Sequence, residues 1–243
     1  MESKENKEIY NPKYVESLFD KMSESYERIN ILFSFGFTYF WRKAMIKKIK
    51  NQVNPTPKLI DLMTGMGETW DLIKIYFPKS TVTGLDISTG MLGRATKKNK
   101  EKFDNKIITT RQNVLENSLN ANEYDLVLCA FGLKTFNEAQ ISILAKEVKR
   151  ILKPNGSFGF VEISAPNNFI LKIFYQIYLG KITPIITKLL LGDPVEYRML
   201  WQYTSKFENA KKVEKIFNEE GLKVVYDKYF FGCASGIRGI KME

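Results

Sequence analysis

One short stretch, residues 58–68, restricts the fold of this chain more than any other. Leu59, Ile60 and Leu62 form an apolar run typical of a buried strand, and Gly65 and Gly67 follow at once. Glycine adopts positive φ angles and lets a ligand approach the backbone where a Cβ would clash. The residues after Gly67 are expected to begin a helix whose first amides face the same space. The stretch therefore predicts a strand, a turn and a helix that border a ligand pocket.

A second predicted strand, residues 81–86, ends in an acidic side chain. Asp86 lies about 20 residues beyond the glycines, the spacing at which a carboxylate can accept hydrogen bonds from a ribose. The two strands together predict a pocket for a nucleoside.

Strands and helices alternate along the rest of the chain. The continuous apolar segment 124–130 is typical of a strand covered on both faces. Ser88 is a suitable N-cap for the helix after the second strand. This order predicts an α/β fold with a doubly wound, mostly parallel, Rossmann-like sheet of seven strands. The predicted strands are 59–62, 81–86, 106–112, 124–130, 157–163, 223–230 and 234–241, and the predicted helices are 12–33, 39–50, 68–77, 88–100, 137–152 and 208–220.

The chain is predicted to form a single domain of four segments. Residues 1–54 form an N-terminal helical cover over the pocket, 55–166 the cofactor-binding core, 167–205 a helical cap, and 206–243 a last helix and two strands. Residues 169–191 are strongly apolar but interrupted by Lys, Gly and Pro. We expect them to form one or two surface helices that cap a hydrophobic substrate or lean on a membrane; a dimer interface and ordinary core are the alternatives.

Composition excludes several kinds of chemistry. The chain of 243 residues has no histidine, which excludes a histidine general base, and it lacks a cluster of Cys and acidic residues that would hold a metal. The net charge of +10 favours an anionic partner such as a membrane surface, although a solvated lysine-rich surface is the commoner explanation. The polar start is unlike a secretory signal, no long uninterrupted apolar run predicts a bilayer span, and the two cysteines do not suggest a disulfide. We therefore expect a cytoplasmic protein, peripheral to the membrane if it contacts one.

The glycine turn favours one class of nucleoside. A dinucleotide-binding turn would have a third glycine where this chain has Trp70, and Glu68 would repel a diphosphate. An acidic turn suits a cation, and S-adenosylmethionine offers a ribose, an ammonium and a sulfonium without a phosphate. Asn113, which follows the third strand, could bind the edge of the adenine, and Ile87 and Met91 could enclose its ring.

Further motifs carry a resemblance to a known family. They are Phe19-Asp20, Ser25-Tyr26, Trp41-Arg42, Ala130-Phe131-Gly132-Leu133-Lys134, Val161-Glu162-Ile163-Ser164-Ala165-Pro166 and Tyr197-Arg198-Met199-Leu200. In this order they resemble the ubiquinone/menaquinone C-methyltransferases, a family of class I S-adenosylmethionine-dependent methyltransferases. The resemblance covers about residues 14–241 and implies C-methylation of an apolar quinol such as demethylmenaquinol.

The resemblance also implies roles for individual residues, and it has departures. Thr64 and Met66 replace a glycine and a threonine of the family's turn, Lys134-Thr135 replaces an Arg-Asn pair, and Arg238 stands where the family has a histidine. The predicted catalytic residues are Glu162, Tyr26, Lys134 and Tyr197; the cofactor-binding residues are Asp61, Thr64, Gly65, Met66, Gly67, Asp86, Ile87, Met91, Asn113, Val114 and Ala130; the substrate-binding residues are Phe33, Phe131 and Arg198.

These departures keep other functions open. Methylation of another small molecule at C, O or N is the first alternative, and a catalytically silent protein that binds S-adenosylmethionine is the second. RNA methylation ranks last, and no nucleic acid is expected as a partner, because the lysines are scattered without interleaved aromatic residues for stacking bases. A homodimer remains an alternative use of the apolar segment.

Overall fold

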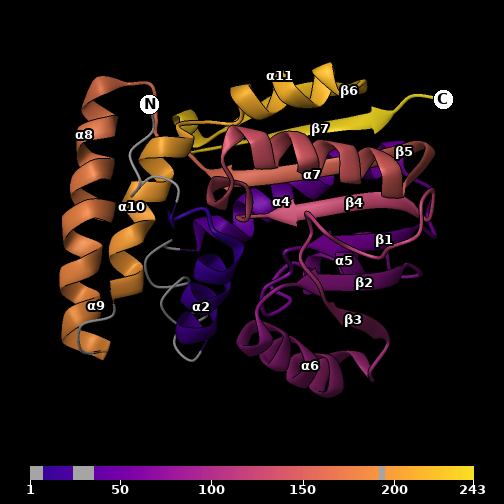
Figure 1. Ribbon diagram of the computed structural model, residues 1–243, viewed down its shortest axis with the longest axis horizontal. Coiled ribbons are helices and arrows are strands. Elements are labelled where there is room, and N and C mark those ends of the chain that lie inside the picture. Colours follow the sequence, from indigo (N-terminus) through magenta and orange to yellow (C-terminus); the bar gives the residue numbers. More distant parts are fainter. Residues whose placement is uncertain (1–7, 24–35, 192–194) are drawn as a thin grey trace.

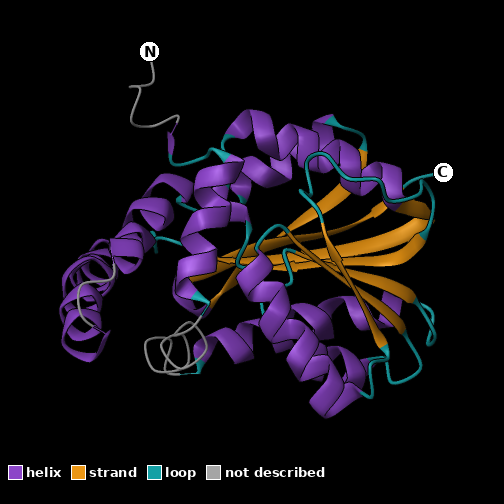
Figure 2. Ribbon diagram, turned by 60° about the horizontal axis from the view of Figure 1, so that its bottom comes forward, coloured by secondary structure: helices purple, strands orange, loops and turns teal. Residues whose placement is uncertain are grey.

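The computed structural model describes residues 8–23, 36–191 and 195–243, and within them seven strands form a single twisted sheet (Figures 1 and 2). The order across the sheet is β3-β2-β1-β4-β5-β7-β6. Only β7 runs against its neighbours in the described sheet, pairing antiparallel with both β5 and β6. The predicted doubly wound, mostly parallel sheet is confirmed. The strands are β1 (Lys58–Leu62), β2 (Thr81–Asp86), β3 (Ile107–Arg111), β4 (Tyr124–Ala130), β5 (Leu152–Ile163), β6 (Leu222–Tyr229) and β7 (Ala234–Lys241).

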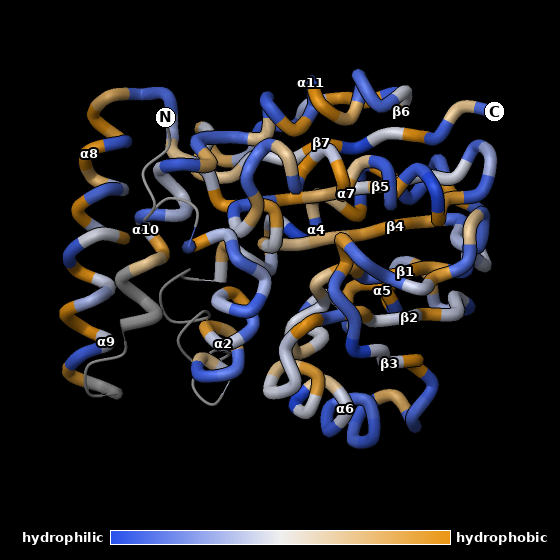
Figure 3. The backbone as a smooth tube through the Cα atoms, in the orientation of Figure 1, coloured by the Kyte–Doolittle hydropathy of each residue, from blue (hydrophilic) through white to orange (hydrophobic). Residues whose placement is uncertain are grey.

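Helices cover the sheet on both faces, and each face has its own apolar core. On one face α7 (Glu138–Ile151) and α11 (Lys211–Glu219) pack on the sheet, with Leu144 and Phe217 in the core. On the other face lie α4 (Phe37–Ile49), α5 (Trp70–Tyr76) and α6 (Thr89–Phe103), with Ile46 and Trp70 buried. The central strands are apolar because both of their faces are covered, and Figure 3 shows β4 hydrophobic along most of its length.

Local signals account for where the helices begin. Ser88 caps α6 as predicted, since its side chain accepts a hydrogen bond from the backbone N–H of Met91. Asn137 and Gln140 form a capping box at the start of α7. The predicted helix 12–33 is observed as α2 (Pro12–Met22), and the rest of that range lies outside the described residues.

The fifth strand is longer than expected. It was predicted from residue 157, but β5 begins at Leu152, which pairs with Tyr124. The register between β4 and β5 then shifts, and Asn155 adopts a positive φ of 60°. Residues 153–156, between the predicted helix 137–152 and the predicted strand 157–163, therefore form an irregularity inside the strand rather than a break before it.

The apolar segment after β5 folds into helices at one end of the sheet, at the left of Figure 1. They are α8 (Phe169–Ile177), a π-helical turn η3 (Tyr178–Ile182), α9 (Thr183–Leu191) and α10 (Val195–Phe207). The first three follow one another without a break and form one helix, in which the backbone N–H of Thr183 donates to the backbone oxygen of Tyr178 in the π turn just before Pro184. In the described part of the chain Phe169–Leu189 is the one helix whose length and composition would suit a bilayer span, which the interrupted sequence did not predict.

Three-residue 3₁₀ turns complete the described chain. They are η1 (Lys50–Gln52) after α4, η2 (Leu133–Thr135) after β4 and η4 (Phe230–Gly232) between β6 and β7. The second of these follows the strand that ends at the pocket described next.

Candidate active site

A pocket opens where β1, β2 and β4 end, with an empty volume of about 830 Å³ including the space open to solvent. The neighbouring strands β1 and β4 are followed by helices on opposite faces of the sheet, and this switch point is where α/β folds bind ligands. Eight of the predicted cofactor residues and one predicted substrate residue line the pocket: Thr64, Gly65, Asp86, Ile87, Met91, Asn113, Val114, Ala130 and Phe131.

The glycine turn has the shape that the sequence predicts. Gly65 and Gly67 have φ angles of 59° and 76°. A Cβ on Gly65 would lie 2.9 Å from a carboxylate oxygen of Glu68, and one on Gly67 would lie 2.5 Å from the ring of Trp70. Only glycine therefore fits this turn without a shift of its neighbours.

Trp70 takes the place of the third glycine of a dinucleotide turn, and the structure shows how it fits. Its ring is fully buried, and a Cβ on Gly84 of β2 would lie 2.7 Å from it. The close approach of α5 to the sheet thus depends on a glycine in the neighbouring strand. The pairing of Trp70 with Gly84 is visible only in the tertiary structure.

Asp86 ties the turn to the second strand. The backbone N–H of Gly65 donates to Oδ2 of Asp86 at 2.8 Å, and that of Ser88 donates to Oδ1 at 2.9 Å. Burial raises the pKa of Asp86 to about 6, although both hydrogen bonds oppose the rise. Asp86 lines the pocket, and its carboxylate keeps lone pairs beyond these two bonds; its contact with a ribose stays a prediction.

Asp61, Met66 and Gly67 do not line the pocket. Asp61 lies beneath the turn, where its Oδ2 accepts a hydrogen bond of 2.6 Å from the hydroxyl of Thr64. Burial raises the pKa of Asp61 to about 7. A structural role as the anchor of the turn follows from these contacts, while direct cofactor contact by these three residues stays a prediction.

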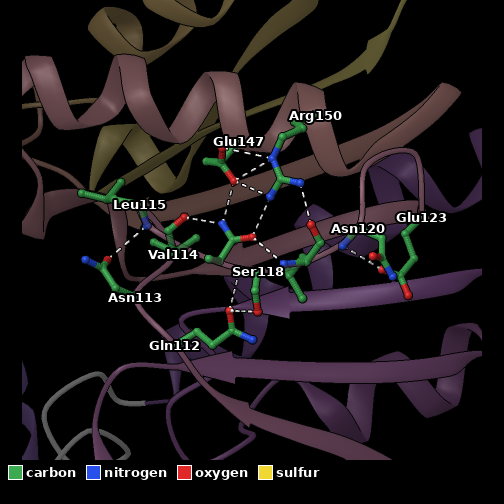
Figure 4. Close-up of polar contacts among 11 residues, drawn as sticks. Gln112, Asn113, Val114, Leu115, Ser118, Asn120, Glu123, Glu147 and Arg150 are labelled. Atoms are coloured by element: carbon green, nitrogen blue, oxygen red, sulfur yellow. Dashed lines mark hydrogen bonds and ion pairs between the residues drawn. The ribbon is translucent and has the colours of Figure 1, made fainter.

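The loop after β3 places Asn113 in the lining of the pocket, and Figure 4 shows its contact with Leu115. Oδ1 of Asn113 accepts a hydrogen bond from the N–H of Leu115, which leaves its amide nitrogen to donate to an adenine. Asn117 holds this loop to α7, because its amide donates both to the backbone of Val114 and to Glu147.

Two predicted catalytic residues form a buried ion pair beside the pocket. Nζ of Lys134 lies 2.9 Å from Oε1 of Glu162 and donates to the backbone oxygen of Phe131 at 2.8 Å. The other carboxylate oxygen of Glu162 accepts from the backbone N–H of Lys134 at 3.1 Å. Neither side chain lines the pocket, but Phe131 does, and it has a φ of 70°. The pair therefore fixes the backbone around Phe131; proton transfer by either side chain stays a prediction.

The remaining predicted residues cannot be placed in the site. Tyr26 and Phe33 fall outside the described residues. Tyr197 and Arg198 belong to α10, in a part whose side chains are also outside the description.

The site contains residues that were not predicted for it. Tyr10, Pro12, Val15 and Phe19 line the pocket from the N-terminal side, as does Arg42 of α4. Arg42 stands in the Trp41-Arg42 motif and Phe19 in the Phe19-Asp20 motif, so the signals were present in the sequence without an assigned role.

Asp20 connects α2 to the start of α6 by hydrogen bonds. It accepts hydrogen bonds from the hydroxyl of Ser88 at 2.6 Å and from the N–H of Gly90 at 2.8 Å, at the N-terminus of α6. Gln140 of α7 donates to the backbone oxygen of Tyr10 at 2.9 Å. These contacts hold α2 beside the pocket, while a cover formed by the N-terminal helices stays a prediction.

The pocket residues fit S-adenosylmethionine. Glycines let the ligand approach the protein backbone, a buried acid suits its ribose, and Glu68 suits its positive charge. With the sheet order, they define a class I S-adenosylmethionine-dependent methyltransferase. The chain matches the ubiE/COQ5 methyltransferase family over residues 2–241 and belongs to that family, which confirms the predicted resemblance.

Relatives and solved structures agree with this assignment. The demethylmenaquinone methyltransferases of Lactobacillus johnsonii and Thermotoga maritima are each 33% identical, over 95% and 91% of this chain and 94% and 93% of theirs. A methyltransferase from Aquifex aeolicus has the same fold, with a TM-score of 0.61 at 15% identity, over 88% of this chain and 97% of its own. Phosphoethanolamine N-methyltransferase 2 of Haemonchus contortus with bound S-adenosylhomocysteine has a TM-score of 0.65 at 13% identity, over 93% of this chain and 60% of its own.

Proposed function

We propose that this methyltransferase methylates a ring carbon of an apolar quinol of the demethylmenaquinol type. The observation that carries the proposal is the similarity, over nearly the whole chain, to relatives named demethylmenaquinone methyltransferases. The pocket supports it, because apolar side chains that are not predicted to bind the cofactor also line it: Val15, Phe19, Phe131 and Phe136.

The protein binds and orients the two reactants and excludes water from the pocket. When bound, S-adenosylmethionine supplies a methyl group that passes to the ring carbon, with one proton released and S-adenosylhomocysteine left behind. Asp86 and Asn113 hold the nucleoside, and α2 shields the pocket from solvent. Holding the two reactants about 3 Å apart in a dry site supplies much of such an acceleration.

The test is methyl transfer from labelled S-adenosylmethionine to reduced demethylmenaquinol by the purified chain. We expect label on the quinol ring, and we expect Asp86→Asn to transfer far less. If S-adenosylhomocysteine binds but no quinol of any side-chain length is labelled, the substrate assignment is wrong. Label on the oxygen of a phenol or the nitrogen of an amine from a parallel panel would then establish the alternative acceptor.

We further propose that the outer face of α8 and α9 rests on an anionic bilayer, where an apolar quinol would be found. Phe169 is 75% exposed and Leu189 is 80% exposed, and Ile170, Phe174 and Ile185 are also exposed. Only 11% of this helix is buried within the described chain. So large an exposed apolar face is typical of a surface that contacts a membrane or another protein.

Basic residues lie along the same helix as the exposed apolar side chains. The exposed residues Lys172, Lys181 and Lys188 along the same helix, with the net charge of +10, favour an anionic surface as the partner.

Co-sedimentation with vesicles tests this contact. We expect binding to vesicles that contain phosphatidylglycerol, weaker binding to pure phosphatidylcholine, and a loss on Phe174→Ser with Leu189→Ser. Ile75→Ser is the control, because Ile75 is also exposed but lies on α5. Binding that the double substitution leaves unchanged would refute the proposal, and a dimer that the double substitution dissociates would show that a second copy covers this face.

A further inference from the structure

Arg42 is a buried cation without enough partners. It lies in α4, is 8% exposed and lines the pocket, with its guanidinium carbon 4.6 Å from the centre of the Phe131 ring. Its Nε has no hydrogen-bond partner, and its ion pair with Glu68 is 3.8 Å long, beyond hydrogen-bond distance. A buried N–H of a charged group that has no acceptor is unfavourable, so a guanidinium in this state is suited to a ligand.

Glu68 brings the opposite charge to the same wall. Its Oε2 accepts a hydrogen bond from the N–H of Met66 at 3.0 Å and lies close above Gly65. Asp86 accepts a hydrogen bond from the backbone N–H of the same glycine. Gly65 therefore adjoins both the acid predicted to hold the ribose and the acid that pairs with Arg42.

We propose that Arg42 and Glu68 bind the amino-acid end of S-adenosylmethionine, with Arg42 on its carboxylate and Glu68 on its ammonium. This inference rests on cofactor binding and not on the identity of the methyl acceptor. An α-amino acid carries both charged groups on one carbon, which matches two opposite charges 3.8 Å apart. The planar guanidinium suits a carboxylate because it can donate two parallel hydrogen bonds, and stacking on Phe131 holds its plane.

Calorimetry with three ligands tests the assignment without any turnover. S-adenosylhomocysteine has both charged groups, its decarboxylated analogue has only the ammonium, and 5′-methylthioadenosine has neither. We expect Arg42→Met to weaken S-adenosylhomocysteine by about 10- to 100-fold, the usual range for a lost charged hydrogen bond. The same variant should bind the other two ligands within about threefold of the wild type. Glu68→Gln should weaken the binding of S-adenosylhomocysteine and of its decarboxylated analogue and leave the binding of 5′-methylthioadenosine unchanged.

Lys47→Met provides the matched control, since Lys47 is an exposed residue of the same helix and its loss changes the net charge equally. It should bind all three ligands as the wild type does. Retained binding of 5′-methylthioadenosine shows in each variant that the nucleoside pocket is folded.

Four results would overturn the inference. Equal weakening of all three ligands by Arg42→Met would assign Arg42 a packing role. Unchanged affinity for S-adenosylhomocysteine, with a raised KM for the quinol, would place Arg42 at the methyl acceptor. If the wild type binds 5′-methylthioadenosine as tightly as S-adenosylhomocysteine, the amino-acid end has no site here, although methyl transfer to the quinol could still be observed. Absence of any S-adenosylhomocysteine binding would overturn the proposed function together with this inference.

Discussion

Replacing Lys134 by methionine tests the buried ion pair with Glu162 directly. The two side chains are 8% and 0% exposed, and Lys134→Met removes the contacts of Nζ to Glu162 and to the backbone oxygen of Phe131. Removing one partner of a buried pair costs about 3–5 kcal/mol, because the other charge stays buried without compensation. Glu162 keeps backbone donors from Lys134 and Ile163, so we expect a loss near the lower limit, about 3 kcal/mol.

An exposed pair of the same length is the control. Nζ of Lys153 lies 2.8 Å from Oδ1 of Asp125, and these side chains are 41% and 22% exposed. Lys153→Met should cost less than about 1 kcal/mol, because water solvates the remaining charge. Urea unfolding gives both free energies, provided that the slope with denaturant stays unchanged.

The double variant Lys134→Met with Glu162→Gln completes the cycle. Without either charge, it should be more stable than Lys134→Met alone, with a coupling energy of about 2 kcal/mol. A loss below about 1 kcal/mol for Lys134→Met, as in the control, would refute the reasoning about the buried pair. A fall in kcat of about 100-fold or more for Glu162→Gln, with S-adenosylhomocysteine affinity and stability unchanged, would instead support proton transfer by Glu162.

Three further predictions concern the glycine turn and its neighbours. Asp61→Asn should become more stable relative to the wild type as pH rises from about 4 to 7. The folded wild type holds the proton of Asp61 up to a pKa of about 7, so the stability that this proton contributes is fully present below pH 3.8 and is lost as pH rises to about 7. The difference between the two free energies of unfolding in urea should change by at most about 1.4 kcal/mol per pH unit. Gly67→Ala should lower the free energy of unfolding by about 2 kcal/mol or more, because an alanine at this positive φ is strained and its Cβ would contact Trp70. A melting temperature equal to that of the wild type would contradict this steric argument. Asp20→Ala should lower the free energy of unfolding by about 1–2 kcal/mol, because α2 loses its hydrogen bonds to the start of α6. It should also speed the dissociation of S-adenosylhomocysteine in stopped-flow measurements. An unchanged dissociation rate would mean that α2 does not cover the bound ligand.

Much of the fold and part of the site could be predicted because their signals are local. Apolar periodicity predicted the strands, Ser88 predicted the start of α6, and the glycines with Asp86 predicted the pocket at the strand ends. Residues 169–191 were expected to form one or two surface helices, and they form one, because the π turn Tyr178–Ile182 continues the helix through Gly180. Gly180 also lies against Trp201 of α10, a contact between helices that no sequence pattern announces.

The sequence by itself determined the layered α/β architecture and the place of the nucleoside pocket, because backbone conformation and strand burial depend on residues close together in the chain. Only the tertiary structure decided which distant side chains share that pocket. It brought Arg42 beside Glu68, paired Lys134 with Glu162 behind Phe131, and placed Trp70 on Gly84. The physical reason is that charge pairing and close packing depend on distances in space, which the order of residues along the chain does not specify.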